Sequence, residues 1–260
     1  MNDPAAYVKS MPGAEKGEVA TEVAGLAWLA HAGGANVVGV RSFTDDSLTL
    51  DLLPAGSPTT ETAMQFGRDL ATTHNAGAPH FGALPPDAKP RKKHTWIGKA
   101  ELPVGKADTW GLFYAAFRIA PYVDKLQRSG LFVRQDVKLF NDVSRRLADG
   151  DPALCGPAEP VARIHGDLWG GNVVWSEGGA GWLIDPAAHG GHRETDLAML
   201  ALFGGSFVDS VIAGYQQASP LAPGWQQRVP VHQLHPLLVH AVLFGASYAE
   251  QAIATARRLA

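Results

Sequence analysis

Three polar residues in the second half of the chain have the types and spacing that a phosphoryl-transfer site requires. Asp167 lies in the segment His-Gly-Asp-Leu-Trp-Gly-Gly-Asn, which ends at Asn172, and Asp185 follows thirteen residues later in Leu-Ile-Asp-Pro. In such a reaction the charge lies on phosphate oxygens, so a carboxylate must position the acceptor hydroxyl and hard oxygen ligands must hold Mg²⁺. We therefore expect Asp167 to be the catalytic base, and Asn172 and Asp185 to be the metal ligands.

Each of these residues also has a structural interpretation. An aspartate at position 167 can form an Asx turn between two strands, and it is the combination of Asp167 with Asn172 and Asp185 that favours catalysis. His165 precedes a glycine, and at such a turn an imidazole can hydrogen-bond the loop backbone. We therefore expect His165 to brace the loop rather than to carry a proton.

The composition is that of an ordinary globular protein. The 260 residues carry a net charge of −3, with 46% hydrophobic and 18% charged residues. This balance allows a substantial core in one or two lobes and indicates neither a nucleic-acid partner nor a membrane surface. The basic run at 91–94 lies beside prolines and is typical of a solvated loop. Cys155 has no second cysteine to pair with, and the N-terminus has no secretory pattern, so we expect a cytoplasmic protein.

The elements that must position these residues fall into two groups. A strand ending at Lys9, a helix over 18–30 and two strands over 37–43 and 48–53 are expected to form an N-terminal lobe of residues 1–55. A Pro- and Gly-containing break at 54–58 leads into a larger helical lobe of residues 56–260. There the pattern predicts helices over 60–75, 108–129, 134–148 and 237–249, short strands over 161–164, 173–175 and 181–184, and interruptions over 79–103 and 220–230. This is the layout of an α+β, protein-kinase-like two-lobed fold with a reduced N-terminal β lobe.

Four residues of the N-terminal lobe are candidate nucleotide ligands. Lys9 on the first strand and Glu22 on the next helix match the pair that orients the α- and β-phosphates in kinases. The alternative is that Lys9 and Glu22 are solvated surface residues with no role in binding nucleotide. Glu18, one turn earlier, could also take the place of Glu22. Asp51 and Leu53 lie where the lobes join, where backbone groups and an apolar side chain would hold adenine.

The motifs closely resemble those of the fructosamine kinase family, whose fold is similar to that of aminoglycoside and choline kinases. The tryptophan in the catalytic loop and a Gly-His-Arg-Glu segment separate this family from those relatives. Thr95 stands where the family usually has asparagine. The matching segments are 165–172, 184–187 and 191–199, supported by 67–71, 96–98, 117–121 and 240–248.

The resemblance implies ATP-dependent phosphorylation, with Mg²⁺, of the 3-hydroxyl of a ketoamine sugar. Such substrates are fructosamines or ribulosamines, free or on protein lysines, and the activity would be a deglycation repair. It also implies that Trp169 and the loop residues His189, His192, Arg193 and Glu194 shape the sugar pocket. The alternatives are that Trp169 packs in the core and that Arg193 and Glu194 belong, with Asp196, to an ion-pair set that anchors the loop. For Asp196 we prefer the anchoring role.

The chain departs from the family pattern ahead of Lys9. A kinase of this family has two strands and a glycine-rich loop before its lysine, whereas eight residues precede Lys9 and none forms such a loop. Either the chain begins downstream of its natural start or the lobe is reduced. The strand edge left exposed predicts self-association, as a homo-oligomer, or a soft N-terminal lobe.

Three other functions compete with a ketoamine kinase. An aminoglycoside-type small-molecule kinase would favour acidic residues in the C-terminal helices, where Glu250 is almost alone. A truncated, catalytically impaired pseudokinase acting as a binding module would be expected to lose one of the three residues at 167, 172 and 185. A metal-dependent hydrolase could use His189, His192 and Asp185, but the chain has no His-Glu-x-x-His helix.

Overall fold

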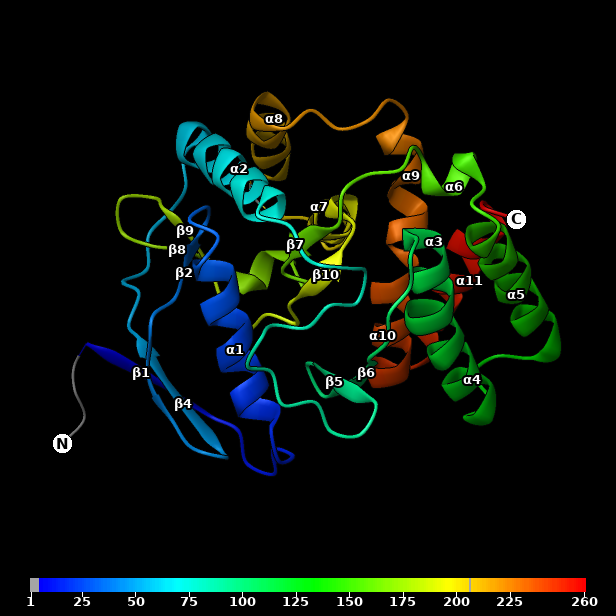
Figure 1. Cartoon of the computed structure of the whole chain (residues 1–260), viewed down its shortest axis with the longest axis horizontal. Helices are drawn as coiled ribbons and strands as arrows, with labels where there is room; N and C mark the ends of the chain where they lie inside the picture. The colour runs from blue at the N-terminus through cyan, green and yellow to red at the C-terminus, as the bar shows by residue number, and fades with distance from the viewer. Residues whose placement is uncertain (1–4, 206) are drawn as a thin grey trace.

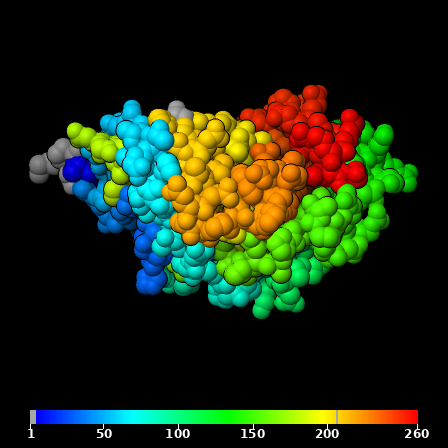
Figure 2. Space-filling model, turned by 90° about the horizontal axis from the view of Figure 1, so that it is seen from above, coloured from blue at the N-terminus to red at the C-terminus, as the bar shows by residue number. Residues whose placement is uncertain are grey.

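The computed structural model describes residues 5–205 and 207–260, which form a small lobe with a sheet and a larger, mainly helical lobe (Figure 1). The two lobes lie side by side along the long axis, with the N-terminal segments at one end and helices α5 (Arg134–Ala148) and α11 (Ala246–Arg257) at the other (Figures 1 and 2). The predicted α+β architecture is confirmed. No helix of the described residues is long and apolar enough to cross a membrane.

The small lobe is a three-stranded antiparallel sheet covered by one helix. Strands β1 (Ala6–Ser10), β4 (Ser47–Asp51) and β3 (Val40–Phe43) pair in the order β1-β4-β3, and helix α1 (Glu18–Ala30) lies against the sheet. Strand β4 alternates, so that Leu48 and Leu50 are buried beneath the helix while their neighbours are not. Lys9 lies opposite Leu48 in the register of β1. Within the described residues β1 is an edge strand, and self-association through this edge stays a prediction.

Short strands at the junction of the lobes carry the candidate site. Strand β2 (Asn36–Val37) runs parallel to β9 (Gly181–Leu183), which pairs antiparallel with β8 (Val173–Trp175). Strand β7 (Ala162–Ile164) pairs with β10 (His189–Gly191). The loop that contains Asp167 therefore connects β7 to β8, and Asp185 follows β9.

The large lobe packs its helices around two separate apolar clusters. Helix α2 (Thr60–Asn75) packs on α8 (Val208–Ala218), and glycines allow this close approach, because a Cβ at Gly67 would lie 2.0 Å from the carbonyl oxygen of Val211. Helix α5 and the C-terminal helices bury the larger apolar cluster, which includes Phe140 and Leu238. Helices α6 (Pro152–Cys155), α7 (Arg193–Leu202), α9 (Trp225–His232) and α10 (Leu234–Phe244) also belong to this lobe.

The predicted bounds of three helices agree with the structure, while five other predictions are wrong in detail. The strand predicted over 37–43 is two strands, β2 and β3, which lie in different sheets. Helices α1, α2 and α5 begin and end where the sequence predicts. The predicted loop 79–103 contains the hairpin of β5 (His94–Ile97) and β6 (Ala100–Pro103), and the interruption 220–230 contains most of α9. The helix predicted over 108–129 is α3 (Trp110–Phe113), a π-helical segment (Tyr114–Ile119) and α4 (Ala120–Arg128). The run 237–249 is broken at Gly245, whose φ of 91° ends α10.

The predicted linker 54–58 is extended and hydrogen-bonded to the large lobe. The amide of Gly56 donates to the carbonyl of Trp175, and the amide of Glu177 donates to the carbonyl of Pro54, both at 2.8 Å. A boundary between the lobes near residue 55 stays a prediction.

Candidate active site

The loop between β7 and β8 is held rigidly by buried polar contacts. The carboxylate of Asp196 accepts the backbone N–H groups of His165 and Gly166 at 2.7 and 2.9 Å. The His165 ring is fully buried, with Nε2 2.8 Å from the carbonyl oxygen of Ile184 and Nδ1 3.2 Å from the amide of Asp167. Nδ1 therefore accepts and Nε2 donates. Burial lowers the pKa of His165, so the neutral ring braces the loop.

Gly166 is required for this loop conformation. Its φ is +82°, and a Cβ at this position would lie 2.3 Å from the carbonyl oxygen of Ala187. The glycine thus lets the loop turn directly beneath the segment that follows Asp185.

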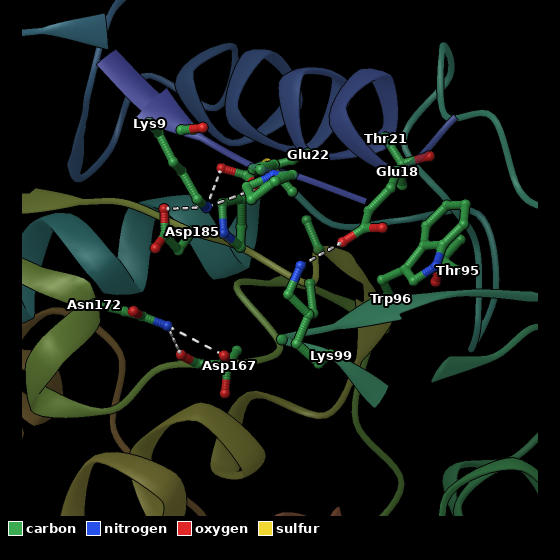
Figure 3. A pocket seen from close by; sticks show the side chains of 17 residues that line it. Lys9, Glu18, Thr21, Glu22, Thr95, Trp96, Lys99, Asp167, Asn172 and Asp185 are labelled. Carbon is green, nitrogen blue, oxygen red and sulfur yellow. Dashed lines mark hydrogen bonds and ion pairs between the residues drawn. The ribbon is translucent and has the colours of Figure 1, made fainter. Parts of the chain in front are cut away.

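Asp167 and Asn172 face the same space from the two ends of the loop (Figure 3). The amide nitrogen of Asn172 donates to the backbone oxygen of Asp167 at 2.8 Å and to its Oδ2 at 3.2 Å. This leaves the amide oxygen of Asn172 as the atom suited to a hard cation. Burial raises the pKa of Asp167 to about 7, although the hydrogen bond from Asn172 acts in the opposite direction. A carboxyl group with this pKa can gain or lose a proton near neutrality.

Two carboxylates predicted from distant parts of the chain, those of Glu22 and Asp185, both contact Lys9. Its Nζ lies 2.8 Å from Oε1 of Glu22 and 2.9 Å from Oδ1 of Asp185 (Figure 3). Burial works against the charge on Lys9, but the two carboxylates raise its pKa above the usual value. Burial also raises the pKa of Glu22, a rise that the ammonium of Lys9 reduces. Asp185 has a left-handed backbone, with φ of 53°, which turns the chain sharply after β9.

Two cavities meet at Lys9 and Asp185. The smaller one, here named the Asp51 cavity, has a volume of about 240 Å³ and an apolar wall. Three predicted cofactor residues line it: Lys9, Asp51 and Leu53. The other lining residues are Tyr7, Val38, Leu50, Leu52, Val174, Ile184 and Asp185.

The larger one, here named the Asp167 cavity, has a volume of about 460 Å³ and also includes Lys9 and Asp185. Asp167, Asn172 and Glu22 line it, so the structure brings together the predicted base, the predicted metal ligands and the lysine–glutamate pair. A planar apolar group would fit the Asp51 cavity, and a polar acceptor would fit the Asp167 cavity. A phosphate chain could then pass between them at Lys9.

Part of the Asp167 cavity was missed by the sequence analysis. Trp96, Lys99 and other residues of the β5–β6 hairpin line it (Figure 3). Glu18, expected only as an alternative to Glu22, also lines it, while Lys9 pairs with Glu22. The match of residues 96–98 to the fructosamine kinase pattern was a signal for this hairpin. Nothing in the local spacing showed that it would form a wall of the cavity.

The residues predicted to shape a sugar pocket are not gathered at this cavity. Trp169 is 42% exposed and lines a neighbouring groove, where its ring meets that of Phe203 edge to face at 6.4 Å. His189 is buried, with Nδ1 2.8 Å from the carbonyl oxygen of Ala187, and burial lowers its pKa to about 3. His192 is buried at the start of α7 and caps its helix by accepting the amide of Glu194.

Arg193 and Glu194 are engaged in ion pairs inside the large lobe. Arg193 binds both carboxylate oxygens of Glu159 at 2.7 Å. Glu194 binds Arg228, with Nε 2.9 Å from Oε2, and its Oε2 lies 3.4 Å from His232. Both side chains thus follow the anchoring alternative. Direct contact of Arg193, Glu194 and the two histidines with the sugar stays a prediction. The geometry does not support it, because these side chains already interact with partners inside the large lobe.

One cluster of possible metal ligands occurs elsewhere among the described residues. His192, Glu194 and His232 offer ligand atoms within 4.8 Å of one another. The guanidinium of Arg228 already occupies the carboxylate of Glu194 at this place and would repel a cation. The cluster therefore gives no support to a metal-dependent hydrolase.

A lysine–glutamate pair between a strand and a helix, in contact with one carboxylate and sharing a cavity with an aspartate loop, is the arrangement of a protein-kinase-like fold. A choline/ethanolamine kinase family protein from Mesorhizobium loti shares this fold, with a TM-score of 0.61 at 15% identity over 98% of this chain and 82% of that one. The match to the family model described as fructosamine kinase extends over residues 3–260. The chain belongs to the fructosamine kinase family.

Two proteins with higher sequence identity to this chain agree with this assignment. A solved structure named "putative fructosamine-3-kinase", from Thermobifida fusca, has a TM-score of 0.88 and 43% identity over 98% of this chain and 85% of that one. A "Probable ketoamine kinase" of Enterococcus faecium is 32% identical over 183 residues, which are 70% of this chain and 61% of that relative. The matched region thus spans about three fifths of the curated relative.

Proposed function

We propose that this protein is an ATP-dependent ketoamine kinase that phosphorylates the 3-hydroxyl of fructosamines or ribulosamines, free or on protein lysines. The observation that carries the proposal is the meeting of two cavities at Lys9 and Asp185, with Asp167 on one side only. We assign the adenine of ATP to the Asp51 cavity and the acceptor sugar to the Asp167 cavity. Family membership supports this choice of substrates. On a glycated protein lysine, this phosphorylation would serve a deglycation repair.

Two residues of the Asp167 cavity fit a hard divalent cation. Asp185 and Asn172 both line this cavity, and carboxylate and amide oxygens are ligands that Mg²⁺ prefers. We propose that these two residues hold Mg²⁺, which when bound neutralises charge on the phosphate oxygens.

The side chains of this chain would perform the remaining work. The ammonium of Lys9 would leave Asp185 and contact the α- and β-phosphates, while it keeps its ion pair with Glu22. Asp167 would orient the 3-hydroxyl for in-line attack and take its proton late, because the transition state is loose. The anchored backbone at His165 and Gly166 would keep Asp167 in position during the reaction.

The proposal is tested by incubating the protein with Mg-ATP and either fructosyl-lysine or ribulosyl-lysine, followed by mass spectrometry of the sugar. A gain of one phosphate group, located on the 3-oxygen by fragmentation or NMR, is the expected result. Asp167→Asn and a reaction with unmodified lysine plus free fructose serve as controls. A folded sample that transfers phosphate to neither ketoamine would overturn the proposal.

A further inference from the structure

Glu18 is the carboxylate of the Asp167 cavity that the proposed chemistry leaves unused. Among the described residues, the cavity is lined by four acidic side chains, from Glu18, Glu22, Asp167 and Asp185. Glu22 and Asp185 hold Lys9, and Asp167 is assigned to the hydroxyl. Glu18 lies apart from them, toward the β5–β6 hairpin (Figure 3).

The carboxylate of Glu18 is fixed in orientation and has one oxygen available. Its residue is 7% exposed, and Oε2 accepts the backbone N–H of Glu15 at 2.8 Å. Oε1 lies 3.8 Å from Nζ of Lys99, which is too long for a hydrogen bond. The side chain of Lys99 is 69% exposed, so its ammonium can move into water at little cost.

We propose that Glu18 binds the secondary ammonium of the ketoamine, an inference that rests on the function proposed above. In a ketoamine the nitrogen is attached to C1, and only C2 separates C1 from the carbon that carries the acceptor hydroxyl. The nitrogen must therefore enter the same cavity as the hydroxyl that Asp167 orients. An ammonium at this partly buried wall is stabilised by an anionic partner, and Oε1 of Glu18 is the carboxylate oxygen there that no other assigned role engages.

The same contact would separate ketoamines from sugars without an amine. A ketoamine replaces the long contact with Lys99 by a direct hydrogen bond to Glu18. A neutral sugar leaves Glu18 without this partner. Trp96 lies on the same wall, where its ring can pack on the alkyl group attached to the nitrogen. A charge-assisted hydrogen bond of this kind corresponds to about a 10- to 100-fold preference.

The test compares two substrates that differ at one atom: 1-deoxy-1-butylamino-fructose and the ether 1-O-butyl-fructose. Glu18→Gln is expected to lower kcat/KM for the amine about 10- to 100-fold, mainly through KM, and to change that for the ether less than about threefold. The glutamine oxygen can still accept the N–H of Glu15, so the helix start is preserved. Glu15→Gln is the matched control, because Glu15 pairs with Arg91 rather than lining the cavity. Lys99→Met is expected to lower KM for the amine, because it removes the competing ammonium.

The outcomes separate this inference from the proposed function. If the wild type phosphorylates both sugars and Glu18→Gln lowers both equally, Glu18 does not bind the amine, although the kinase assignment stands. If the wild type phosphorylates neither, the proposed function fails, and calorimetric titration with the butylamino sugar decides the inference instead. Binding that is at least tenfold weaker in Glu18→Gln would support the role of Glu18. Equal binding, or no binding to the wild type, would overturn it.

Discussion

The substitution Asp196→Asn tests whether the catalytic loop owes its position to one buried carboxylate. Asp196 is 1% exposed and lies at the start of α7, beneath the loop. Its two oxygens accept the backbone N–H groups of His165 and Gly166, and Oδ2 lies 3.1 Å from Nε2 of His74. Burial works to raise the pKa of Asp196, but the contacts with His74 and the backbone N–H groups hold it below its usual value.

The magnitude follows from these three contacts. Asparagine keeps one oxygen and turns an NH₂ group toward at least one of the donors, so one backbone N–H is left buried without an acceptor. A hydrogen bond to a charged group contributes about 1.5–3 kcal/mol, and an unsatisfied buried donor costs about 1–3 kcal/mol. We therefore expect Asp196→Asn to lower the free energy of unfolding by about 3–5 kcal/mol. A loop displaced by about 1 Å is also expected to lower kcat about 100-fold.

The assay combines urea unfolding at pH 7, followed by far-UV circular dichroism, with steady-state phosphorylation of a ketoamine. Asp124→Asn is the matched control, because Asp124 is 61% exposed and pairs with Arg128 on the surface of α4. This variant is expected to stay within about 0.5 kcal/mol of the wild type. If Asp196→Asn loses less than about 1 kcal/mol and keeps kcat within about threefold, the carboxylate does not position the loop.

Three further substitutions test separate parts of the site. Asp167→Asn is expected to lower kcat by at least about 100-fold while ATP binding, measured by calorimetry, is unchanged; near-normal turnover would remove the assignment of the base. Asp185→Asn is expected to weaken Mg²⁺-dependent nucleotide binding at least about tenfold, and an unchanged Kd would place the metal elsewhere. Burial works to raise the pKa of Glu194, but the contact with His232 and the ion pair with Arg228 outweigh it and lower the pKa from 4.5 to about 2. Its ionised form therefore stabilises the fold above about pH 4.5, and this contribution is lost as the pH falls toward 2. Glu194→Gln should be less stable than the wild type by about 3 kcal/mol at pH 7, and urea unfolding should show this difference vanish near pH 2. A difference in stability that does not change with pH would contradict the assigned pKa. A raised KM for the sugar would favour a contact between Glu194 and the substrate.

Much of the site was predictable from the sequence because its chemistry is encoded locally. Asp167 and Asn172 lie five residues apart on one loop, and short apolar strands flank that loop. Helices with clear apolar periodicity, such as 18–30 and 60–75, were predicted with correct bounds. The β5–β6 hairpin was missed because its surroundings are rich in proline, glycine and lysine, which hide the alternation of a strand.

The sequence did not predict most of the contacts that charged residues make with each other in the folded protein. Lys9 and Asp185 are 176 positions apart, and spacing suggested a kinase role for each without showing that they would touch. Glu194 and Glu18 are both glutamates near the start of a helix, yet one is paired with Arg228 inside the lobe and the other lines the cavity.

The sequence by itself determined the type of chemistry, the family and the bounds of three helices, because these depend on residue identity and on periodicity along the chain. Only the tertiary structure decided which charged side chains face the Asp167 cavity and which are paired in the interior. The physical reason is that a buried charge is stabilised by whichever opposite charge the packing brings close, and that partner can come from any distance along the sequence.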